Sequence, residues 1–327
     1  MKKITNIIEK TYILTKDGYF YIDDLLGTNI IWDGYKWREV IIFQNDNILQ
    51  EKTYYKLIFS DGCEVICDST HKLYIVDDMS SNIYRTIPIT SIKENSLLYK
   101  YSFPFIEGDN KNNLKYPYIS GYNIGYMYNI NNINNEYISK EHIDNIYIKI
   151  PNIIYNIDSS NLSTYIPINA SLNNRLLWLS GLIDVNGSIT NIKDGIYLNI
   201  IVNSKEFAMK VKYLCNTLGT NPRILENTEI RKVILNKSPN LYKNIQENSN
   251  KNYKKRYTLI FNAEDTNKIF LEYDIKTYYF IYDKSQYSLD QDINRYLSIK
   301  KIVKFIDIKK SYSITDTYSL IGNGILI

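Results

Sequence analysis

Hydrophobic and polar positions divide the chain into three stretches of different periodicity. Between residues 11 and 97, short apolar runs alternate with turns that contain Asp-Gly, at Asp17–Gly18, Asp33–Gly34 and Asp61–Gly62. Strands punctuated by such turns are typical of an all-β fold built from hairpins. A similar β-pattern returns from residue 298 onward. We therefore expect β-structure at both ends of the chain.

The middle of the chain predicts a mixture of helices and strands. A dense apolar run follows Ser171 and stops near Gly187, which is the pattern of a capped, buried helix with a C-terminal glycine. Residues 188–202 then predict a strand pair, and residues 204–218 a second helix closed by Gly219. The order of helix, hairpin and helix indicates an α+β unit.

This arrangement indicates one domain inserted into another. The polar connection at residues 98–116 marks a boundary. We predict one half of a β-domain at residues 1–97, an inserted α+β domain at residues 98–297, and the last part of the β-domain at residues 298–327. The Asn/Ile-rich run at residues 128–137 is expected to be a loop.

Composition narrows the function only slightly. The net charge of +4 permits a nucleic-acid partner but does not require one. The abundance of tyrosine, with 32 residues, is most simply explained by an AT-rich genome. Three cysteines cannot form a disulfide framework, which indicates a reducing compartment. No apolar run is long enough to span a bilayer. We therefore expect a soluble, intracellular protein of the cytoplasm or nucleus that has no membrane partner. No P-loop, Rossmann, nucleophile-elbow or protein-kinase motif is present.

The segment from Trp178 to Ile189 resembles the LAGLIDADG motif of homing endonucleases. Gly181, Asp184 and Gly187 occupy motif positions, and a hairpin and a helix are expected to follow, as in that family. A much weaker copy runs from Tyr116 to Met127 and retains Gly121 and Gly125. The resemblance implies a monomer with pseudo-two-fold symmetry, in which the glycines let two motif helices pack closely.

The β-rich ends resemble the Hint domain of inteins. Residues 12–25 are similar to the opening block of that domain, residues 61–74 to the second splicing block, with His71 as its histidine, and residues 315–327 to the last blocks. The matches occur in the right order and are most similar to inteins of ribonucleotide reductase large subunits. The resemblance implies a split Hint-type β-domain interrupted by a LAGLIDADG (DOD-type) domain, and hence an origin in protein splicing and intron homing by a mobile genetic element.

The residues that the resemblance assigns to splicing are degraded. Splicing starts with an acyl shift onto a Cys or Ser, because a side-chain nucleophile must accept the acyl group. That position falls near Asn6, which cannot react in this way. His71 would polarise the scissile amide, but Asp68 replaces the usual Thr and is expected to favour a protonated His71. The C-terminal step needs a cyclising Asn or Gln, and the sequence ends at Ile327.

The residues assigned to DNA cleavage are also altered. Homing endonucleases of this family use one carboxylate from each motif helix to bind Mg²⁺, which activates water. The corresponding positions are Asn186 in the strong copy and Tyr126 in the weak copy. Asn186 and Asp184 are the remaining, weak candidates for metal ligands. We therefore expect cleavage to be lost and Mg²⁺ to be the cofactor only if nuclease activity survives.

Binding to double-stranded DNA can outlive catalysis, because it depends on strands in the major groove and on cations at phosphates. The candidate strands are residues 189–202 and 230–235. The candidate phosphate contacts are Arg231, Lys232, Lys254, Lys255 and Arg256. A solvated, lysine-rich surface is the alternative interpretation of the basic run.

Other interpretations remain open at this point. Cys63, Cys67 and His71 are spaced four residues apart, but no fourth ligand completes a zinc site, and two buried thiols with a hydrogen-bonded strand histidine explain them equally well. The whole chain is an intein-derived, DNA-binding homing-endonuclease relative, or a non-enzymatic viral or mobile-element protein that reuses the scaffold for binding or structure. A residual Hint autoprocessing protease is a third hypothesis.

Overall fold

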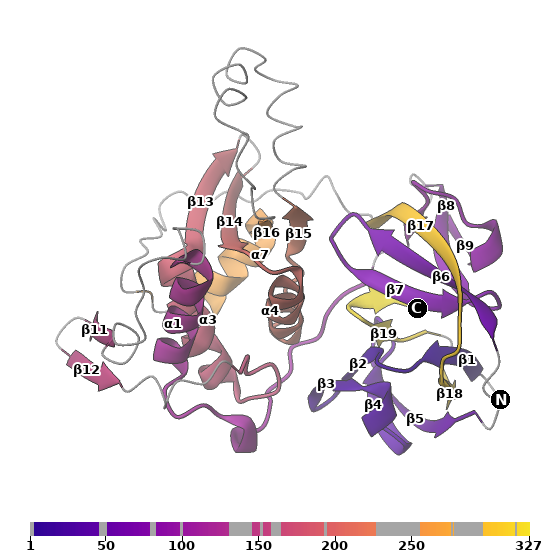
Figure 1. The fold of residues 1–327 in the computed structure, drawn as a ribbon, viewed down its shortest axis with the longest axis horizontal. Coiled ribbons are helices and arrows are strands. Elements are labelled where there is room, and N and C mark those ends of the chain that lie inside the picture. Colours follow the sequence, from indigo (N-terminus) through magenta and orange to yellow (C-terminus); the bar gives the residue numbers. More distant parts are fainter. Residues whose placement is uncertain are drawn as a thin grey trace, which may run out of the picture. The chain divides into compact units, whose positions relative to one another are not determined.

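The computed structural model describes residues 3–45, 51–78, 83–98, 101–130, 146–150, 153–157, 165–192, 195–226, 256–275, 277, 297–317 and 319–327. The chain forms two compact units (Figure 1). We call Met1–Gly108, Cys215–Gly219 and Ile293–Ile327 the β-unit, and Asp109–Leu214 with Thr220–Asp292 the α+β unit.

The β-unit is built around a 14-stranded sheet whose strand pairs are antiparallel. Its strands are β1 (Lys3–Ile8), β2 (Tyr12–Thr15), β3 (Gly18–Tyr21), β4 (Gly27–Trp32), β5 (Trp37–Gln44), β6 (Lys52–Phe59), β7 (Glu64–Asp68), β8 (Lys72–Asp78), β9 (Ile83–Pro88), β10 (Leu97–Leu98), β17 (Leu297–Asp307), β18 (Ser311–Thr315), β19 (Ile321–Gly322) and β20 (Ile325–Leu326). Short 3-10 turns lie at Ile22–Asp24 and Ile89–Ser91. The β-pattern of the sequence is thus observed at both ends of the chain.

Strands from the two ends of the chain interleave within this sheet. The strand order is β20-β19-β2-β4-β5-β18-β1-β7-β6-β17-β10-β8-β9, with β3 paired to β2. The late strand β18 therefore lies between β5 and β1, and β17 lies between β6 and β10 (Figure 1). Residues from both ends of the sequence consequently complete a single sheet.

The first strand was not predicted from the sequence, where the expected strands began at residue 11. β1 instead pairs with both β18 and β7, and Ile4, Ile7 and Ile8 are buried. The register shifts between Ile4 and Ile7, and Asn6 has a positive φ of 61°. This irregularity breaks the two-residue alternation that identifies a strand in a sequence.

The α+β unit contains three long helices and a four-stranded antiparallel sheet. Its elements are η3 (Asn110–Asn112), α1 (Pro117–Ile130), β11 (Ile146–Ile150), β12 (Ile153–Ile157), α3 (Leu172–Asn186), β13 (Gly187–Ile192), β14 (Gly195–Val202), α4 (Lys205–Thr217), β15 (Arg223–Glu226), β16 (Tyr257–Phe261), α7 (Ala263–Asn267) and a π-helical turn, η5 (Lys268–Glu272). The sheet has the order β13-β14-β16-β15, and β11 pairs with β12 in a separate hairpin. Both helices and the strand pair predicted between residues 171 and 219 are therefore confirmed.

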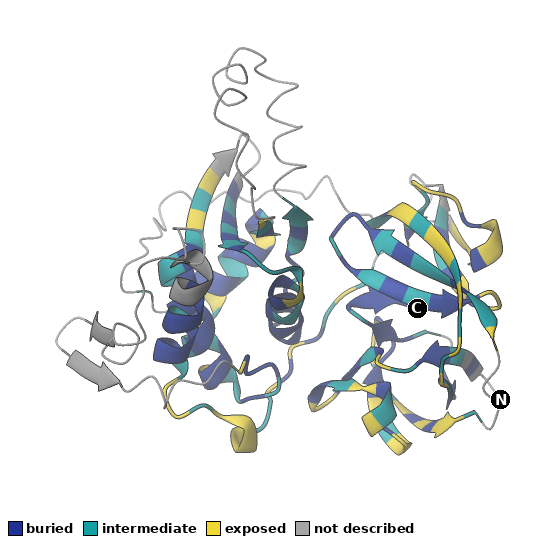
Figure 2. Ribbon diagram, viewed as in Figure 1, coloured by how far each residue is buried: buried dark blue, intermediate teal, exposed yellow. Residues whose placement is uncertain are grey.

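Burial follows the periodicity expected for each element (Figure 2). In β14, Ile196, Leu198, Ile200 and Val202 are buried while the intervening residues are partly exposed, as in a strand with one core-facing side. The Ser204 hydroxyl accepts a hydrogen bond of 3.3 Å from the Phe207 amide and so caps the start of α4. Among the described residues, the helices are all too short or too polar to cross a membrane.

Candidate functional site

Helices α1 and α3 meet through two glycines. A Cβ atom added to Gly121 would lie 1.9 Å from the carbonyl oxygen of Trp178, and one added to Gly181 would lie 2.0 Å from the carbonyl oxygen of Tyr118. Each glycine therefore contacts the residue that precedes the other glycine by three positions, so the contact is reciprocal. Any side chain at either position would collide with backbone of the opposite helix. The sequence prediction that these glycines permit close packing is confirmed.

Gly187 ends α3 for a different reason from the one predicted. Its φ of −77° lies outside the left-handed region, so it is not the left-handed cap that usually favours glycine after a helix. A Cβ atom there would instead lie 2.5 Å from the carbonyl oxygen of Ile183. Glycine is required by the lack of space where the helix turns directly into β13.

A hydrogen bond joins the two helices through Tyr118 and Asp184. The Tyr118 hydroxyl donates to Oδ2 of Asp184 over 2.8 Å. The residue that corresponds to Tyr118 in the second helix is Trp178, and the one that corresponds to Asp184 in the first is Ile124. Ile124 offers no acceptor, and the buried indole N–H of Trp178 has no hydrogen-bond partner among the described residues. The pair of helices is thus symmetric in its glycines but not in its polar contacts.

The end of α3 places Asn186 against α1. Asn186 is buried, with 6% of its surface exposed, and its Nδ2 atom lies 3.4 Å from the position of a Cβ on Gly125. Asp184 is partly exposed and accepts the Tyr118 hydrogen bond. Tyr126 lies on α1, but its side chain is outside the described residues.

The four-stranded sheet has one apolar and one largely polar face. Cross-strand partners share a face, so Ser188, Asn199, Ile260 and Arg223 form one row across all four strands. These four residues are partly or fully exposed, whereas the adjacent row of Ile200, Leu259 and Ile224 is buried. The side-chain amide of Asn199 donates to the Thr190 hydroxyl over 2.8 Å on the same polar face. This face offers hydrogen-bond donors and acceptors on a twisted sheet.

The structure describes one of the five residues predicted to contact phosphates. Arg256, which directly precedes β16, is exposed. Arg231, Lys232, Lys254 and Lys255, and the strand predicted at residues 230–235, lie outside the described residues.

In the β-unit, the residues predicted from the splicing motifs lie together. The Asn6 side chain donates to the Thr70 hydroxyl over 3.1 Å, and that hydroxyl donates to Oδ1 of Asp68 over 2.7 Å. Asp68 also accepts the Thr70 amide, and its own carbonyl accepts the His71 amide. Ile7 is the cross-strand partner of Cys67. The position expected to carry a nucleophile is therefore next to the histidine turn, but an Asn occupies it.

Asp68 acts on the pKa of His71 in the expected direction, but burial outweighs it. Burial lowers the pKa of His71 to about 4, although the nearby Asp68 carboxylate acts in the opposite direction. The imidazole is only 6% exposed, and its Nε2 atom has no hydrogen-bond partner among the described residues. His71 is therefore neutral at physiological pH, because the loss of hydration outweighs the attraction of one carboxylate.

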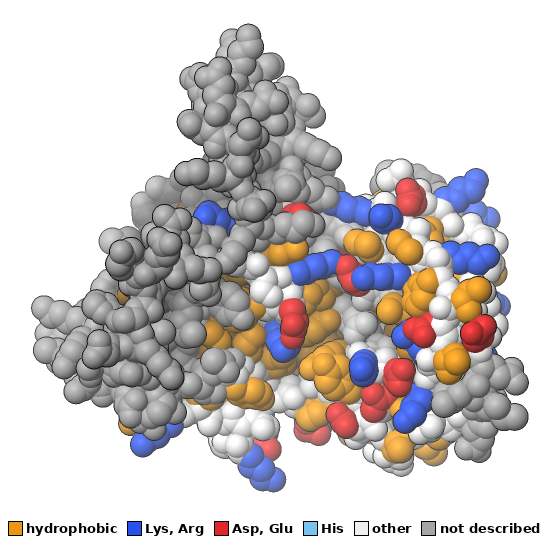
Figure 3. Space-filling model, viewed as in Figure 1, with side chains coloured by type: hydrophobic (Ala, Val, Ile, Leu, Met, Phe, Trp, Pro, Cys, Tyr) orange, Lys and Arg blue, Asp and Glu red, His pale blue; other side chains and the backbone are white. Residues whose placement is uncertain are grey.

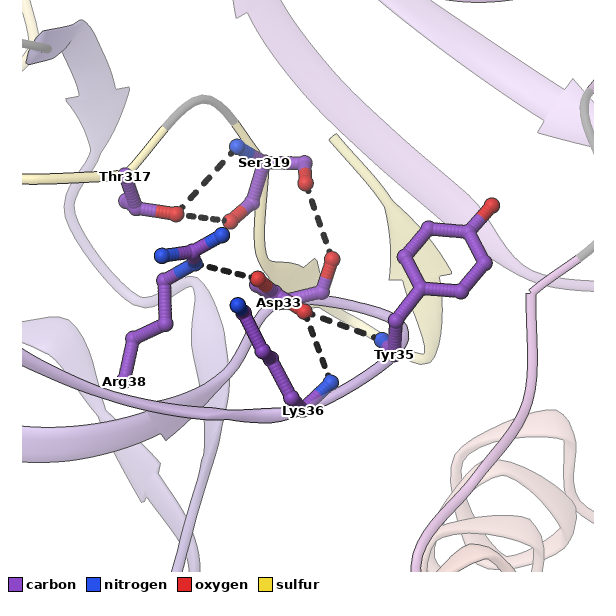
Figure 4. A network of polar contacts seen from close by, with 6 residues as sticks. All are labelled: Asp33, Tyr35, Lys36, Arg38, Thr317 and Ser319. Carbon is purple, nitrogen blue, oxygen red and sulfur yellow. Dashed lines mark hydrogen bonds and ion pairs between the residues drawn. The ribbon is translucent and has the colours of Figure 1, made fainter.

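A polar network holds the last strands of the chain in place, and the sequence analysis did not find it (Figure 4). One oxygen of Asp33 accepts the backbone amides of Tyr35 and Lys36 over 3.0 and 2.8 Å, and the other accepts the guanidinium of Arg38. The Ser319 hydroxyl donates to the Asp33 carbonyl over 2.8 Å. Asp33 thereby closes the β4–β5 turn and anchors the segment before β19. The Asp-Gly turn was visible in the sequence, but its distant partner was not.

A second buried cluster, also missed, lies in the α+β unit. The Lys212 ammonium, which has no exposed surface, donates to the Asn221 side chain and to the Pro222 carbonyl, both over 2.7 Å. The Asn221 amide in turn donates to Asp265 over 3.0 Å. Burial raises the pKa of Asp265 to about 7, against the lowering effect of that hydrogen bond. The cluster ties α4 to α7 through the loop before β15.

The comparison with protein families bears on the α+β unit. Residues 173–273 match the family model described as a LAGLIDADG-like domain. The chain carries a LAGLIDADG-like domain. The matched residues extend from α3 through the sheet to η5, and they include Gly181, one of the two glycines at the helix contact. The resemblance seen in the sequence is confirmed.

A curated relative extends the similarity beyond the LAGLIDADG-like domain. It is the ribonucleoside-diphosphate reductase large subunit of Invertebrate iridescent virus 6, which is 25% identical over 245 residues. The match covers 67% of this chain but 25% of the viral protein, so the chain spans only a quarter of that relative.

Two solved structures of the gp41-1 intein are also similar. A substituted form covers 30% of this chain and 69% of its own, and the unsubstituted form covers 31% and 70%, both at 22% identity. Their TM-scores are 0.24 and 0.23, which are too low to support a shared fold.

The described donor atoms at the end of α3 do not fit a two-carboxylate magnesium site. Mg²⁺ in proteins is bound through carboxylates in near-octahedral geometry. Here the end of α3 offers the neutral amide of the buried Asn186, and the Asp184 carboxylate already accepts a hydrogen bond from Tyr118. Within the described ranges, no group of three His, Cys, Asp or Glu side chains is placed to hold a metal ion.

Proposed function

We propose that this chain is an intein-derived, LAGLIDADG homing-endonuclease-like protein that binds double-stranded DNA and has lost both splicing and cleavage. The observation that carries the proposal is the reciprocal contact of Gly121 and Gly181 within a unit that matches the LAGLIDADG-like family. Two motif helices packed in this way imply a monomer with internal pseudo-two-fold symmetry. The same inference makes the β-unit a Hint-type domain split by the insertion.

The polar face of the four-stranded sheet is the proposed DNA-reading surface. A twisted antiparallel sheet can place alternate side chains in the major groove, where they meet base edges. Ser188, Thr190, Asn199 and Arg223 supply the donors and acceptors on this face. Their partial or full exposure leaves these side chains accessible to a partner.

Loss of chemistry follows from the residues at the two reactive positions. Asn186 lacks the negative charge that a metal-binding carboxylate provides, and Asn6 lacks a nucleophile for the acyl shift. Asn6 instead donates a hydrogen bond to the Thr70 hydroxyl. Neither position can perform the family chemistry.

The test combines binding and cleavage on one duplex. The duplex spans an uninterrupted ribonucleotide reductase insertion site, and a shuffled duplex of equal composition is the control. In the presence of Mg²⁺ we expect a sequence-selective gel shift without cutting. Asn199→Ala should weaken the selective shift, whereas Lys210→Ala on the exposed side of α4 should not.

Two outcomes would contradict the proposal. Cutting of the insertion-site duplex by the unaltered protein would show that cleavage has not been lost. Equal affinity of the unaltered protein for the insertion-site and shuffled duplexes would leave no sequence-selective interface, and would favour a scaffold that has been reused for another purpose.

A further inference from the structure

A basic segment runs along the outside of the β-unit. Residues 300–310, which comprise most of β17 and the turn after it, contain five lysines and one aspartate. Their net charge of +4 equals that of the whole chain, so the remaining residues are neutral overall. In Figure 3, Lys and Arg side chains are visible over the part of the β-unit where Figure 1 draws β6 and β17. This one segment therefore carries a positive charge equal to the net charge of the whole chain.

The basic segment lies outside the hydrophobic core. None of its residues is buried, and Val303 and Ile306 are 37% and 68% exposed. From Lys301 to Asp307 it pairs with β6, which itself pairs with β7 along its other edge. Among the described strands, β10 pairs with β17 only before the basic segment, at Leu297 and Ser298. The basic segment is therefore an edge strand whose side chains are all at least partly exposed.

Most of the positive charge on the basic segment is not neutralised. Lys309 pairs with Asp307 over 2.6 Å, and on the neighbouring strand Lys56 pairs with Glu64 over 2.5 Å. Lys301, Lys304 and Lys310 are exposed, and no carboxylate of the described residues forms an ion pair with them. Three lysines on this edge strand and the turn after it are therefore available to an anionic partner.

We propose that the basic segment is a second DNA contact that binds the phosphate backbone without reading sequence. The inference rests on the proposed DNA-binding function and adds a surface to it. Strand residues are about 3.3 Å apart and alternate between the two faces, so Lys301 and Lys304 lie roughly 10 Å apart along the strand and on opposite faces. Lysines exposed on both faces of an edge strand can approach phosphates from either side, and phosphate contacts carry no sequence information.

Edge lysines also have a simpler role, because they discourage unwanted pairing between sheets of different molecules. The two explanations differ in what they predict for DNA. Protection of an edge requires charge but no DNA affinity, whereas phosphate contacts release counterions and make binding depend steeply on salt. The salt dependence of binding therefore separates them.

The test measures the affinity of the full chain for a short random-sequence duplex between roughly 50 and 200 mM salt. The triple variant Lys301→Gln, Lys304→Gln, Lys310→Gln is compared with a control, Lys10→Gln, Lys16→Gln, Lys36→Gln, which removes the same charge from exposed positions elsewhere on the β-unit. The slope of log affinity against log salt should fall by about 3 in the first variant. It should stay near the wild-type slope in the control.

Each outcome has a distinct meaning. If both variants keep the wild-type slope, or if the slope falls equally in both, the basic segment is not a specific phosphate contact. The inference is then overturned, while the proposed DNA binding by the sheet stands. If the unaltered protein binds no duplex at the lowest salt, the inference and the proposed function both fail. Retention of insertion-site selectivity by the first variant would support separate roles for the segment and the sheet.

Discussion

The contact between α1 and α3 allows a graded test of the helix packing. An alanine at position 121 or 181 must push the opposite backbone away by roughly 1.5 Å, from 1.9 or 2.0 Å to an ordinary contact of 3.4 Å. Overpacking of this kind costs about 1–3 kcal/mol, and backbone cannot turn aside as a side chain can. Alanine regains about 0.5–1 kcal/mol as a better helix former. We therefore expect Gly121→Ala and Gly181→Ala each to destabilise the α+β unit by about 2 kcal/mol.

Gly125→Ala is the matched control on the same helix. Its Cβ would lie 3.1 Å from a side-chain methyl of Leu182 and 3.3 Å from Cβ of Val185, so a shift of a few tenths of an ångström suffices. The strain and the gain in helix propensity should nearly cancel, and the stability should change by less than about 0.5 kcal/mol. The double variant Gly121→Ala, Gly181→Ala should cost less than the sum of the single variants, because one separation of the helices relieves both collisions.

The assay is urea unfolding followed by tryptophan fluorescence. The chain has 3 tryptophans, so Trp32→Phe and Trp37→Phe leave Trp178 at the helix contact as the sole indole. Unfolding of the α+β unit is then read directly. If Gly125→Ala destabilises as much as Gly181→Ala, or if neither Gly121→Ala nor Gly181→Ala changes the midpoint, the close backbone contact does not exist and the reasoning is refuted.

Three further predictions concern polar groups. Tyr118→Phe should destabilise the α+β unit by about 1–2 kcal/mol through loss of the hydrogen bond to Asp184. A double-mutant cycle with Asp184→Asn, measured by urea unfolding, should show that the two residues are coupled. Additive effects of the two substitutions would contradict a direct hydrogen bond. The free energy of unfolding of the β-unit should fall by up to about 3 kcal/mol as the pH falls from 6.5 to 4, because the unfolded chain protonates His71 before the folded one does. In urea unfolding at several pH values, His71→Gln should remove most of this pH dependence. An unchanged pH dependence would contradict the lowered pKa of His71. The pH dependence from Asp265 has the opposite sign, because its raised pKa gives stability that is present below about pH 4 and lost as the pH rises to about 7. Asp265→Asn should remove this decline in the stability of the α+β unit. A decline that persists in the variant would show that another group titrates.

Elements with regular periodicity were predictable from the sequence. The helix after Ser171 has a dense apolar run and is followed by a glycine, and it is observed as Leu172–Asn186. The hairpin β13–β14 and the helix before Gly219 follow the same rule. The glycines at the helix contact were also predictable, although only through a resemblance that identified which two segments pack together.

Features that depend on distant parts of the chain were not predictable. β1 was missed because the bulge at Asn6 disrupts its alternation and its partners, β18 and β7, lie far along the chain. The pKa of His71 was given the wrong direction because the neighbouring Asp68 is visible in the sequence, whereas the burial that outweighs it is not. Ser319 and Asp33 are 286 positions apart, so no local pattern links them.

The interleaved sheet has a consequence for synthesis on the ribosome. Without β17–β20, the earlier strands would fall into separate pieces, because β18 alone links β5 to β1 and β17 alone links β6 to β10 among the described strands. Emerging strands β1–β10 must therefore wait, with open edges, until almost two hundred further residues have been translated, while the α+β unit can already fold. Because the entropy of loop closure grows only with the logarithm of length, that long interruption adds little to the final cost of joining the pieces. The delay affects the nascent chain most, since unpaired edges are the surfaces at which aggregation begins.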